Sequence, residues 1–318
     1  MMYLIVLICL VLVLLAYLKL ADKYNIIDKP NERSSHSNIT IRGGGILFPI
    51  AILIWSFTTG IFNLFTIGLI LISVISFVDD CKPLSNKIRL SIHFISIFLL
   101  MYELGLMNFH VSYLFFGFLF IGGWINAYNF MDGINGITVL YSLSVLLACF
   151  YINSQISFVD KSLLEYTAIS LVVFGFFNVR KKAKVFAGDV GSVSLAFIIA
   201  FIIISLVLET LNWQYILLVS VYGVETLTTI IQRLLKKENI FKAHRSHLYQ
   251  YLANEVKWPQ LKVSFIFAII QLLLNIFLIS IIIPMRSSLL AVSYLTAQGL
   301  LYLIIKYFVI RKIQLKKI

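Results

Sequence analysis

Five short polar stretches interrupt an otherwise apolar chain, and their residue types could bind phosphate groups or a divalent cation. Each stretch gathers carboxylates, amides, glycines or basic side chains within 7 to 13 residues. The stretches are RSSHSNITIRGGG (33–45), DDCKPLSNKIRL (79–90), NAYNFMDGING (126–136), FAGDVGS (186–192) and AHRSHLYQ (243–250). Magnesium prefers oxygen ligands, and arginine side chains and backbone N–H groups suit phosphate oxygens.

Two adjacent carboxylates, Asp79 and Asp80, follow an apolar run. Side by side at the end of a membrane span, they repel each other and are costly to desolvate. A divalent cation or a bound proton would relieve both problems. The alternative is an ordinary solvated helix end, which the aspartate pair taken alone favours.

Asn126, Asn129 and Asp132 are spaced i, i+3, i+6, so on a helix they share one drifting face across about 120°. Gly133 and Gly136 then let the backbone turn or approach a ligand closely. Two amides and a carboxylate suit sugar hydroxyls, a nucleobase or an ion. A polar helix C-cap with a glycine stop is the alternative, and it accounts for Gly133 but not for the asparagines.

Asp189 lies between glycines just before an apolar run. Asp189 or Ser192 could be the N-cap of the helix that follows. Alternatively, the N–H groups of this helix terminus bind a phosphate, and Asp189 holds the metal that bridges it.

His244 and His247 are spaced i, i+3 around Arg245 in the longest polar loop. The spacing is compatible with zinc, but the sequence shows no third protein ligand nearby. Contacts to phosphates fit better beside aspartates that hold magnesium.

Arg42, Gly43 and Gly44 open a glycine run before the second apolar segment. Glycines there would let the backbone approach a phosphate, with Arg42 as the counter-charge. A triple glycine is weak evidence by itself.

Glu225 stands about two turns inside the ninth apolar segment. A carboxylate inside a membrane span is a candidate site residue. A buried hydrogen bond to a neighbouring helix is an alternative of nearly equal weight. His93 and His110 stand alone, and we expect them to be packing or surface residues.

The composition is that of an integral membrane protein. Of the 318 residues, 60 % are hydrophobic and 13 % are charged, against about a quarter in soluble domains. The mean hydropathy is +0.96. Three cysteines without a CxxC pair indicate neither a disulfide framework nor a thiolate zinc site. We expect one membrane domain over residues 1–318, with the N-terminal apolar run retained as the first span.

The apolar runs predict an all-α polytopic bundle of about eleven transmembrane helices, because a span needs roughly 20 apolar residues. They lie at about 2–20, 45–60, 62–78, 88–106, 112–129, 136–153, 162–179, 191–208, 214–232, 262–283 and 288–310.

The basic residues predict the orientation of these helices. With the N-terminus outside and the C-terminus in the cytoplasm, 22 of the 26 lysines and arginines fall on cytoplasmic segments, as the positive-inside rule requires. All five polar stretches then lie on the cytoplasmic side, which indicates a site at the inner face of the membrane.

Other classes of function fit less well. The net charge of +12 is divided among short loops between spans, so nucleic-acid binding is not expected. An ion-coupled transporter or lipid scramblase would place charges near the midplane and use both faces. A non-catalytic assembly partner leaves the carboxylates in separate loops unexplained.

Together the stretches FVDD (77–80), NAYNFMDGINGI (126–137), FAGDVGS (186–192) and AHRSHLYQYL (243–252) resemble those of the polyprenyl-phosphate N-acetylhexosamine-1-phosphate transferases, of glycosyltransferase family 4 type. The resemblance covers about residues 25–255. It implies a bacterial inner-membrane enzyme that transfers a sugar-1-phosphate from a UDP-sugar to undecaprenyl phosphate and releases UMP. It also implies that Mg²⁺ is required, with Mn²⁺ as a substitute. The implied partners are undecaprenyl phosphate, a UDP-N-acetylhexosamine, membrane lipid and, as an option, a second copy of the chain in a homodimer.

The resemblance also implies roles for individual residues. The expected catalytic residues are Asp79, Asp80, Asp189, His244, Arg245 and His247. The expected substrate-binding residues are Arg42, Gly43, Gly44, Asn126, Asn129, Asp132 and Asn135. The expected metal ligands are Asp189 and Asp80.

Three departures refine the expectation. Asn135 replaces an aspartate that the family associates with the nucleotide, and Glu225 replaces a frequent aspartate. The peptidoglycan branch has three successive histidines where this chain has HRSH (244–247), which argues against a muramyl-pentapeptide donor. The loops look more like the branch that initiates O-antigen of lipopolysaccharide, often with 6-deoxy-N-acetylhexosamines. A UDP-N-acetylglucosamine-specific initiator of enterobacterial-type or teichoic-acid glycans is the alternative.

Overall fold

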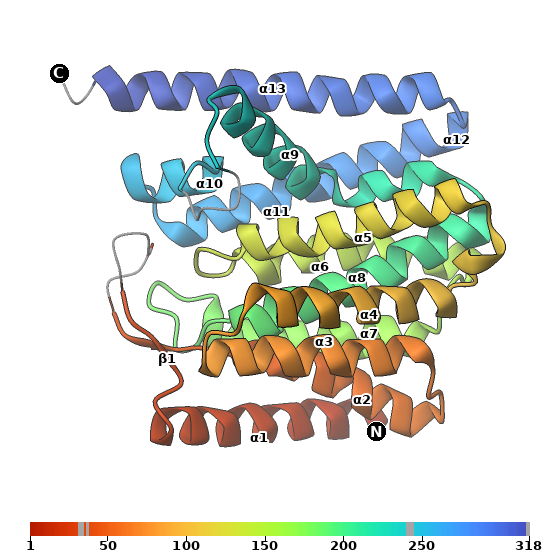
Figure 1. The fold of residues 1–318 in the computed structure, drawn as a ribbon, viewed down its shortest axis with the longest axis vertical. Helices are drawn as coiled ribbons and strands as arrows, with labels where there is room; N and C mark the ends of the chain where they lie inside the picture. The colour runs from red at the N-terminus through yellow and green to blue at the C-terminus, as the bar shows by residue number, and fades with distance from the viewer. Residues whose placement is uncertain (31–34, 36–37, 240–244, 316–318) are drawn as a thin grey trace.

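The computed structural model describes residues 1–30, 35, 38–239 and 245–315. Helices dominate the described chain, as predicted, and most lie side by side along one direction (Figure 1). A two-stranded antiparallel sheet, β1 (Ile27–Asp28) with β2 (Thr40–Ile41), lies in the loop after the first helix. The long helices are α1 (Met2–Lys23), α2 (Leu47–Thr59), α3 (Leu64–Cys81), α4 (Asn86–Glu103), α5 (Val111–Met131), α6 (Ile137–Ile156), α7 (Lys161–Asn178), α8 (Gly188–Thr210), α9 (Ser220–Leu235), α11 (Gln260–Phe277) and α13 (Ser288–Leu315).

Each of the eleven apolar segments predicted from the sequence contains helix in the structure. Eight helical segments among the described residues are long and apolar enough to cross a membrane. They are Met2–Lys23, Leu64–Cys81, Val111–Met131, Ile137–Ile156, Gly188–Thr210, Trp213–Leu235, Gln260–Met285 and Ser288–Leu315. The helical segment that includes α2 is shorter, and α4 and α7 carry charged residues near their ends. The chain is thus a multi-pass helical membrane protein.

The ninth predicted span is not one continuous α-helix. It begins as a 3-10 helix, Trp213–Val219, and continues as α9. Gln271 of α11 fills the junction: its Oε1 accepts from Val221 N at 3.1 Å, and its Nε2 donates to Leu218 O at 2.9 Å. A buried amide thus satisfies backbone groups that the change of helix type leaves without helical partners.

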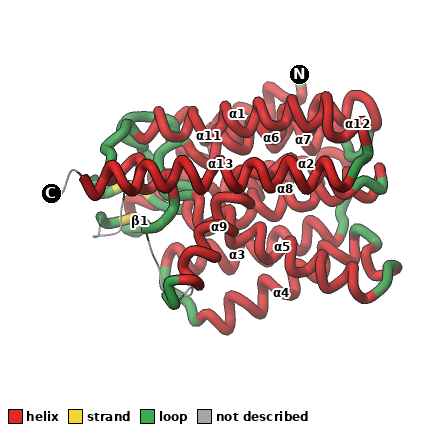
Figure 2. The backbone as a smooth tube through the Cα atoms, turned by 90° about the horizontal axis from the view of Figure 1, so that it is seen from above, coloured by secondary structure: helices red, strands yellow, loops and turns green. Residues whose placement is uncertain are grey.

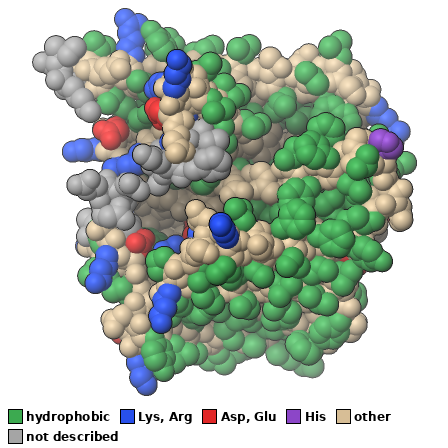
Figure 3. All heavy atoms as spheres, viewed as in Figure 1, with side chains coloured by type: hydrophobic (Ala, Val, Ile, Leu, Met, Phe, Trp, Pro, Cys, Tyr) green, Lys and Arg blue, Asp and Glu red, His purple; other side chains and the backbone are tan. Residues whose placement is uncertain are grey.

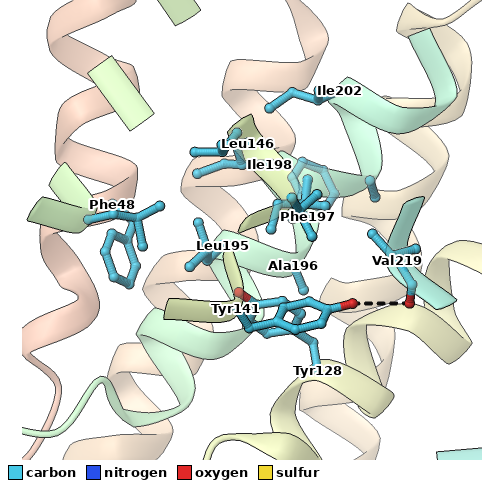
Figure 4. Close-up of a cluster of buried hydrophobic side chains, with 14 of the residues drawn as sticks. Phe48, Tyr128, Tyr141, Leu146, Leu195, Ala196, Phe197, Ile198, Ile202 and Val219 are labelled. Carbon is cyan, nitrogen blue, oxygen red and sulfur yellow. Dashed lines mark hydrogen bonds between the residues drawn. The ribbon is translucent and has the colours of Figure 1, made fainter. Parts of the chain in front are cut away.

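Helix α8 forms the centre of the bundle. In an apolar stretch of 18 residues within α8, 83 % of the residues are buried. In the corresponding stretch of α13, 11 % of the residues are buried. Figure 4 shows Leu195, Ala196, Phe197 and Ile198 of this helix among side chains from its neighbours. A helix that is apolar on all sides belongs in the interior, and α8 therefore holds the surrounding helices in register.

Tyrosines join α5, α6 and α9 beside this centre. The rings of Tyr141 and Tyr222 stack with centroids 3.5 Å apart, and Tyr128 meets both edge-on. The Tyr141 hydroxyl donates to Val219 O at 3.1 Å, the dashed line in Figure 4. Each ring thus contributes apolar contact while a backbone carbonyl satisfies this buried hydroxyl.

One end of the bundle is polar. The strands and many of the longer loops gather at the end where the C-terminus lies, and the N-terminus lies at the opposite end (Figures 1 and 2). Figure 3 shows most of the visible basic and acidic side chains at that same end and hydrophobic side chains over much of the remaining surface. The described residues of the polar stretches, near the beginnings and ends of these helices, therefore meet at one end.

Candidate active site

Two glycine-containing stretches that are far apart in the sequence form the frame of the site. Phe186 N donates to Ile41 O at 2.8 Å, Gly44 N to Phe186 O at 2.9 Å and Gly45 N to Ala187 O at 3.0 Å. A Cβ on Gly45 would lie 2.2 Å from Gly191 Cα, so only glycine allows this approach. The N–H groups of Gly44 and Gly45 are therefore engaged by backbone carbonyls.

Asp80 of α3 caps the N-terminus of α8. Its Oδ1 accepts from Asp189 N and its Oδ2 from Val190 N, each at 2.9 Å, and Arg42 Nε lies 2.6 Å from Oδ1. The Asp80 side chain is completely buried. Gly188 has φ +72°, and a Cβ there would lie 2.4 Å from Asp80 Oδ2. A carboxylate from another helix thus stabilises the positive end of the α8 dipole.

This cap corrects one alternative from the sequence. Helix α8 begins at Gly188, before Asp189, and shows no side-chain cap from its own segment. The hydroxyl of Ser192 donates back to Gly188 O at 3.2 Å. Neither Asp189 nor Ser192 is the N-cap, because Asp80 already bonds the first N–H groups.

Arginines alternate with the aspartates. Arg42 Nη2 lies 3.1 Å from Asp189 Oδ1, and Arg89 Nη1 lies 2.6 Å from Asp79 Oδ2 and 3.9 Å from Asp189 Oδ2. Burial alone would lower the pKa of Arg42, but Asp80 and Asp189 outweigh it and raise this pKa above its usual value. The structure therefore brings together four of the predicted site residues, Asp79, Asp80, Asp189 and Arg42, and adds Arg89.

A polar cavity of about 330 Å³ adjoins this cluster. Its lining comes from loops, from strand β1 and from helix ends at the polar end, including the start of α8. The lining residues are Asp28, Ser35, Arg42, Asn129, Asp132, Gly133, Ile134, Asn135, Asn178, Phe186, Ala187, Gly188, Asp189, Ser192, Gln250 and Gln260. Gly43 and Gly44 lie beside the cluster, but they do not line the described part of the cavity.

The predicted face Asn126–Asn129–Asp132 divides in the structure. Asn129 and Asp132 line the cavity. Asn126 is exposed and donates to Gly122 O of its own helix at 2.8 Å. Asp132 follows the last residue of α5 and accepts a hydrogen bond from the Thr138 hydroxyl. Burial raises the pKa of Asp132 to about 6.

Asn135 holds the cavity wall together. Its Nδ2 donates to Arg180 O at 2.9 Å and to Lys181 O at 3.3 Å, and its backbone N–H donates to Gln260 Oε1 at 3.0 Å. The neighbouring Gly136 N donates to Asn178 Oδ1 at 2.9 Å. A carboxylate could not make the two side-chain donations, which accounts for asparagine at this position.

His247 of the basic loop points into the protein. Its side chain is 3 % exposed, and its Nδ1 bonds the carboxylate of Glu225. The structure describes Arg245, but this residue does not line the described part of the cavity. Gln250 does line it. His244 lies outside the described residues. The predicted phosphate contacts of this loop stay a prediction.

Some residues of the charged cluster and of the cavity were missed from the sequence. Arg89 lies in the stretch 79–90, but only its charge was used in assigning the orientation. Asp28 ends the short strand β1, and Asn178, Gln250 and Gln260 lie at helix ends. Single polar residues there carry no local signal, because which of them meet depends on how the helices pack.

The residues at the cluster fit a divalent cation in chemistry and in sign of charge. Three aspartates face two arginines in the cluster, so the carboxyl groups outnumber the guanidinium groups. Asp189, with its side chain 22 % exposed, lines the cavity together with Asp132 and Asn129, and these are the oxygen donors magnesium prefers. Within the described part of the chain, no three His, Cys, Asp or Glu side chains are already grouped as metal ligands. Asp80 already bonds two N–H groups and Arg42, so Asp189 is the better placed ligand.

One family profile matches part of this chain. The profile described as "Glycosyl transferase family 4" matches residues 61–207. This region runs from α3 to α8 and contains Asp79, Asp80, Asp132 and Asp189.

Curated relatives extend the similarity beyond that region. The chain is 26 % identical over 263 residues to a "Probable undecaprenyl-phosphate N-acetylglucosaminyl 1-phosphate transferase" of Bacillus subtilis, covering 74 % of this chain and 71 % of the relative. It is 28 % identical over 278 residues to a "Phospho-N-acetylmuramoyl-pentapeptide-transferase" of Streptococcus pneumoniae, covering 75 % and 83 %. A protein of the same description from Lactococcus lactis subsp. cremoris is 31 % identical over 182 residues, covering 54 % and 53 %.

Proposed function

We propose a function on the premise that this chain belongs to glycosyl transferase family 4 and is a phosphosugar transferase enzyme. It transfers a sugar-1-phosphate from a UDP-N-acetylhexosamine to undecaprenyl phosphate. The products are undecaprenyl-pyrophosphoryl-sugar and UMP. The observation that carries the proposal is the cluster of Asp79, Asp80, Asp189, Arg42 and Arg89 beside a polar cavity at one end of a membrane bundle.

The reaction joins two anions. An oxygen of the lipid phosphate attacks the phosphorus that carries the sugar, and the bond from that phosphorus to the bridging oxygen breaks. UMP leaves with the bridging oxygen. Catalysis of such a step depends on positioning the groups and on neutralising their charge.

The site residues divide this work. Asp189, with Asp132 and Asn129, would hold magnesium, which supplies positive charge to the phosphate oxygens when bound. Arg42 and Arg89 would neutralise further phosphate charge. Asp80 keeps the N-terminus of α8 in place for these contacts.

We further propose eleven spans with the N-terminus outside, the C-terminus inside and the site on the cytoplasmic face of the bacterial inner membrane. The distribution of 22 of 26 basic residues supports this arrangement. Cysteines introduced near Lys184 and Lys237 should react with an impermeant reagent only after the cytoplasmic side is opened. Labelling from outside intact cells would contradict the orientation.

The preferred donor is a UDP-N-acetylhexosamine, with 6-deoxy forms favoured, as in initiation of O-antigen. The HRSH sequence (244–247) supports this choice over a pentapeptide donor. An apolar wall rejects one extra hydroxyl only weakly, by about a hundredfold at most, so more than one hexosamine donor should react.

The test is UMP release by the purified protein with undecaprenyl phosphate, magnesium and single UDP-sugars. The panel contains UDP-N-acetylglucosamine, its 6-deoxy relatives and UDP-muramyl-pentapeptide. We expect turnover with the hexosamines that stops with chelator and returns with Mg²⁺ or Mn²⁺. Preference for the pentapeptide donor would move the chain to the peptidoglycan branch, and turnover that survives chelation would exclude the metal.

A further inference from the structure

Glu225 is an acidic side chain buried inside a candidate membrane span. None of its side-chain surface is exposed, yet three donors from two other segments converge on its carboxylate. They are His247 Nδ1, Leu248 N at 2.5 Å and Tyr302 OH at 2.9 Å. A carboxylate in apolar surroundings is costly unless it is well bonded, so this convergence gives Glu225 a defined set of partners.

A buried cation stands at the other end of the same hydrogen-bonded chain. Lys306 of α13 is 1 % exposed, and its Nζ donates to Thr229 Oγ1 at 2.8 Å. Thr229 Oγ1 lies 3.5 Å from Tyr302 OH, which in turn donates to Glu225. The Lys306 ammonium also lies 5.4 Å from the centroid of the Tyr302 ring. Opposite charges of α9 and α13 are thus linked through two hydroxyl groups.

The chain of contacts leads from α13 to the cavity. Because a carboxylate only accepts, Glu225 requires the proton of His247 on Nδ1 and fixes the orientation of the ring. His247 N donates to Gln250 Oε1 at 3.2 Å, and Gln250 lines the polar cavity. Most of α13 faces outward, but its buried polar side chain, Lys306, belongs to this network.

We propose that Glu225 is a positioning residue, which with Tyr302 and Lys306 of α13 holds the segment from Arg245 to Gln250 in its working place at the cavity. The proposal rests on the transferase function above, in which this segment would contact the substrate phosphates. It makes α13, which lies outside the region matched by the family profile, a required part of the site.

The first test measures the anchoring without any substrate. Hydrogen exchange of the purified protein in micelles is followed by mass spectrometry in peptides containing the Leu248 amide. Glu225→Gln keeps the size of the side chain but loses one acceptor, and Tyr302→Phe removes one hydroxyl. We expect exchange at this segment to rise about tenfold or more in Glu225→Gln, as loss of a hydrogen bond to a charged group implies, and less in Tyr302→Phe.

The second test measures UMP release by the same variants. Loss of positioning should lower kcat by about ten- to a hundredfold in Glu225→Gln, with the KM for the donor nearly unchanged. Thr296→Val is the matched control on α13, because Thr296 is exposed and, among the residues that the structure describes, its hydroxyl bonds Val292 O of its own helix. Should Glu225→Gln not fold, Tyr302→Phe carries both measurements.

The outcomes separate the two hypotheses. Faster exchange with lower kcat supports the proposal, provided the Thr296→Val variant behaves as the wild type. Unchanged exchange, or faster exchange with full activity, overturns it. If Glu225→Gln exchanges faster but the wild-type protein itself releases no UMP with any donor, the anchoring is supported and the transferase function is contradicted.

Discussion

Of the three clustered aspartates, Asp79, Asp80 and Asp189, we expect Asp80 to be structural and Asp189 to be functional, and comparing Asp80→Asn with Asp189→Asn tests this. Asp80 accepts two backbone N–H groups of α8 and the Nε of Arg42. An amide offers one oxygen and one NH₂ group, so in Asp80→Asn a donor must face a donor at one of these positions. Asp189 instead contacts arginines and lines the cavity.

The expected magnitude follows from these contacts. Breaking a fully buried ion pair costs about 3–5 kcal/mol. Arg42 is 33 % exposed and keeps Asp189 as a partner at 3.1 Å. We therefore place Asp80→Asn near the lower limit, at a loss of about 3 kcal/mol in the free energy of unfolding. For Asp189→Asn, with a partly exposed pair and no capped backbone, we expect a loss of at most about 1 kcal/mol.

The assay combines stability with activity. Unfolding is followed by far-UV circular dichroism in mixed micelles of non-ionic detergent and increasing dodecyl sulfate, and UMP release is measured on the same preparations. Asp189→Asn should abolish turnover in a folded protein, whereas Asp80→Asn should unfold earlier. A stable Asp80→Asn protein without activity would refute the reasoning, because it would make Asp80 a reacting or metal-binding group and not a cap.

Three further changes test other parts of the site. The pKa of Asp132 is about 6 in the folded protein, against an ordinary value of 3.8. Between these two pH values the unfolded chain loses the proton first, so the wild type should lose about 1–3 kcal/mol of unfolding free energy relative to Asp132→Asn as the pH rises. Asn135→Asp removes the two hydrogen bonds that Asn135 Nδ2 donates to Arg180 O and Lys181 O, and it should lower the free energy of unfolding by about 1–3 kcal/mol, measured by the same detergent titration. Gly45→Ala places a Cβ 2.2 Å from a backbone atom of α8 and should cost about 1–3 kcal/mol together with most of the activity.

The second and third of these changes each have a control in the same chain. Asn126→Asp alters an exposed amide on α5 and should leave stability nearly unchanged, unlike Asn135→Asp. Gly123 has no atom within 4 Å of an added Cβ among the described residues, so Gly123→Ala should be tolerated. Equal losses within either pair would contradict the packing described, and a stability difference for Asp132→Asn that does not change with pH would contradict its raised pKa.

The helices themselves could be predicted from the sequence. An apolar run near 20 residues forms a helix in a membrane because its backbone groups must bond within the segment. The break before Ser220 could not be predicted this way, because the amide that stabilises it comes from α11. Helix type inside an apolar run depends on such partners.

The candidate site could be predicted in its residue types and not in its contacts. The sequence places Asp189 near a helix start, but only the tertiary structure supplies Asp80 as the cap. The i, i+3 spacing joins Asn126 to Asn129, yet only Asn129 lines the cavity.

What the sequence by itself determined is the number and approximate extent of the helical segments and the concentration of polar chemistry at their ends. The tertiary structure decided which charges pair: Arg42 with Asp80 and Asp189, Arg89 with Asp79, and Glu225 with His247. Helical periodicity fixes directions around one axis. It carries no information about which neighbouring helix will present the complementary group, and that choice depends on how α8 and its neighbours pack.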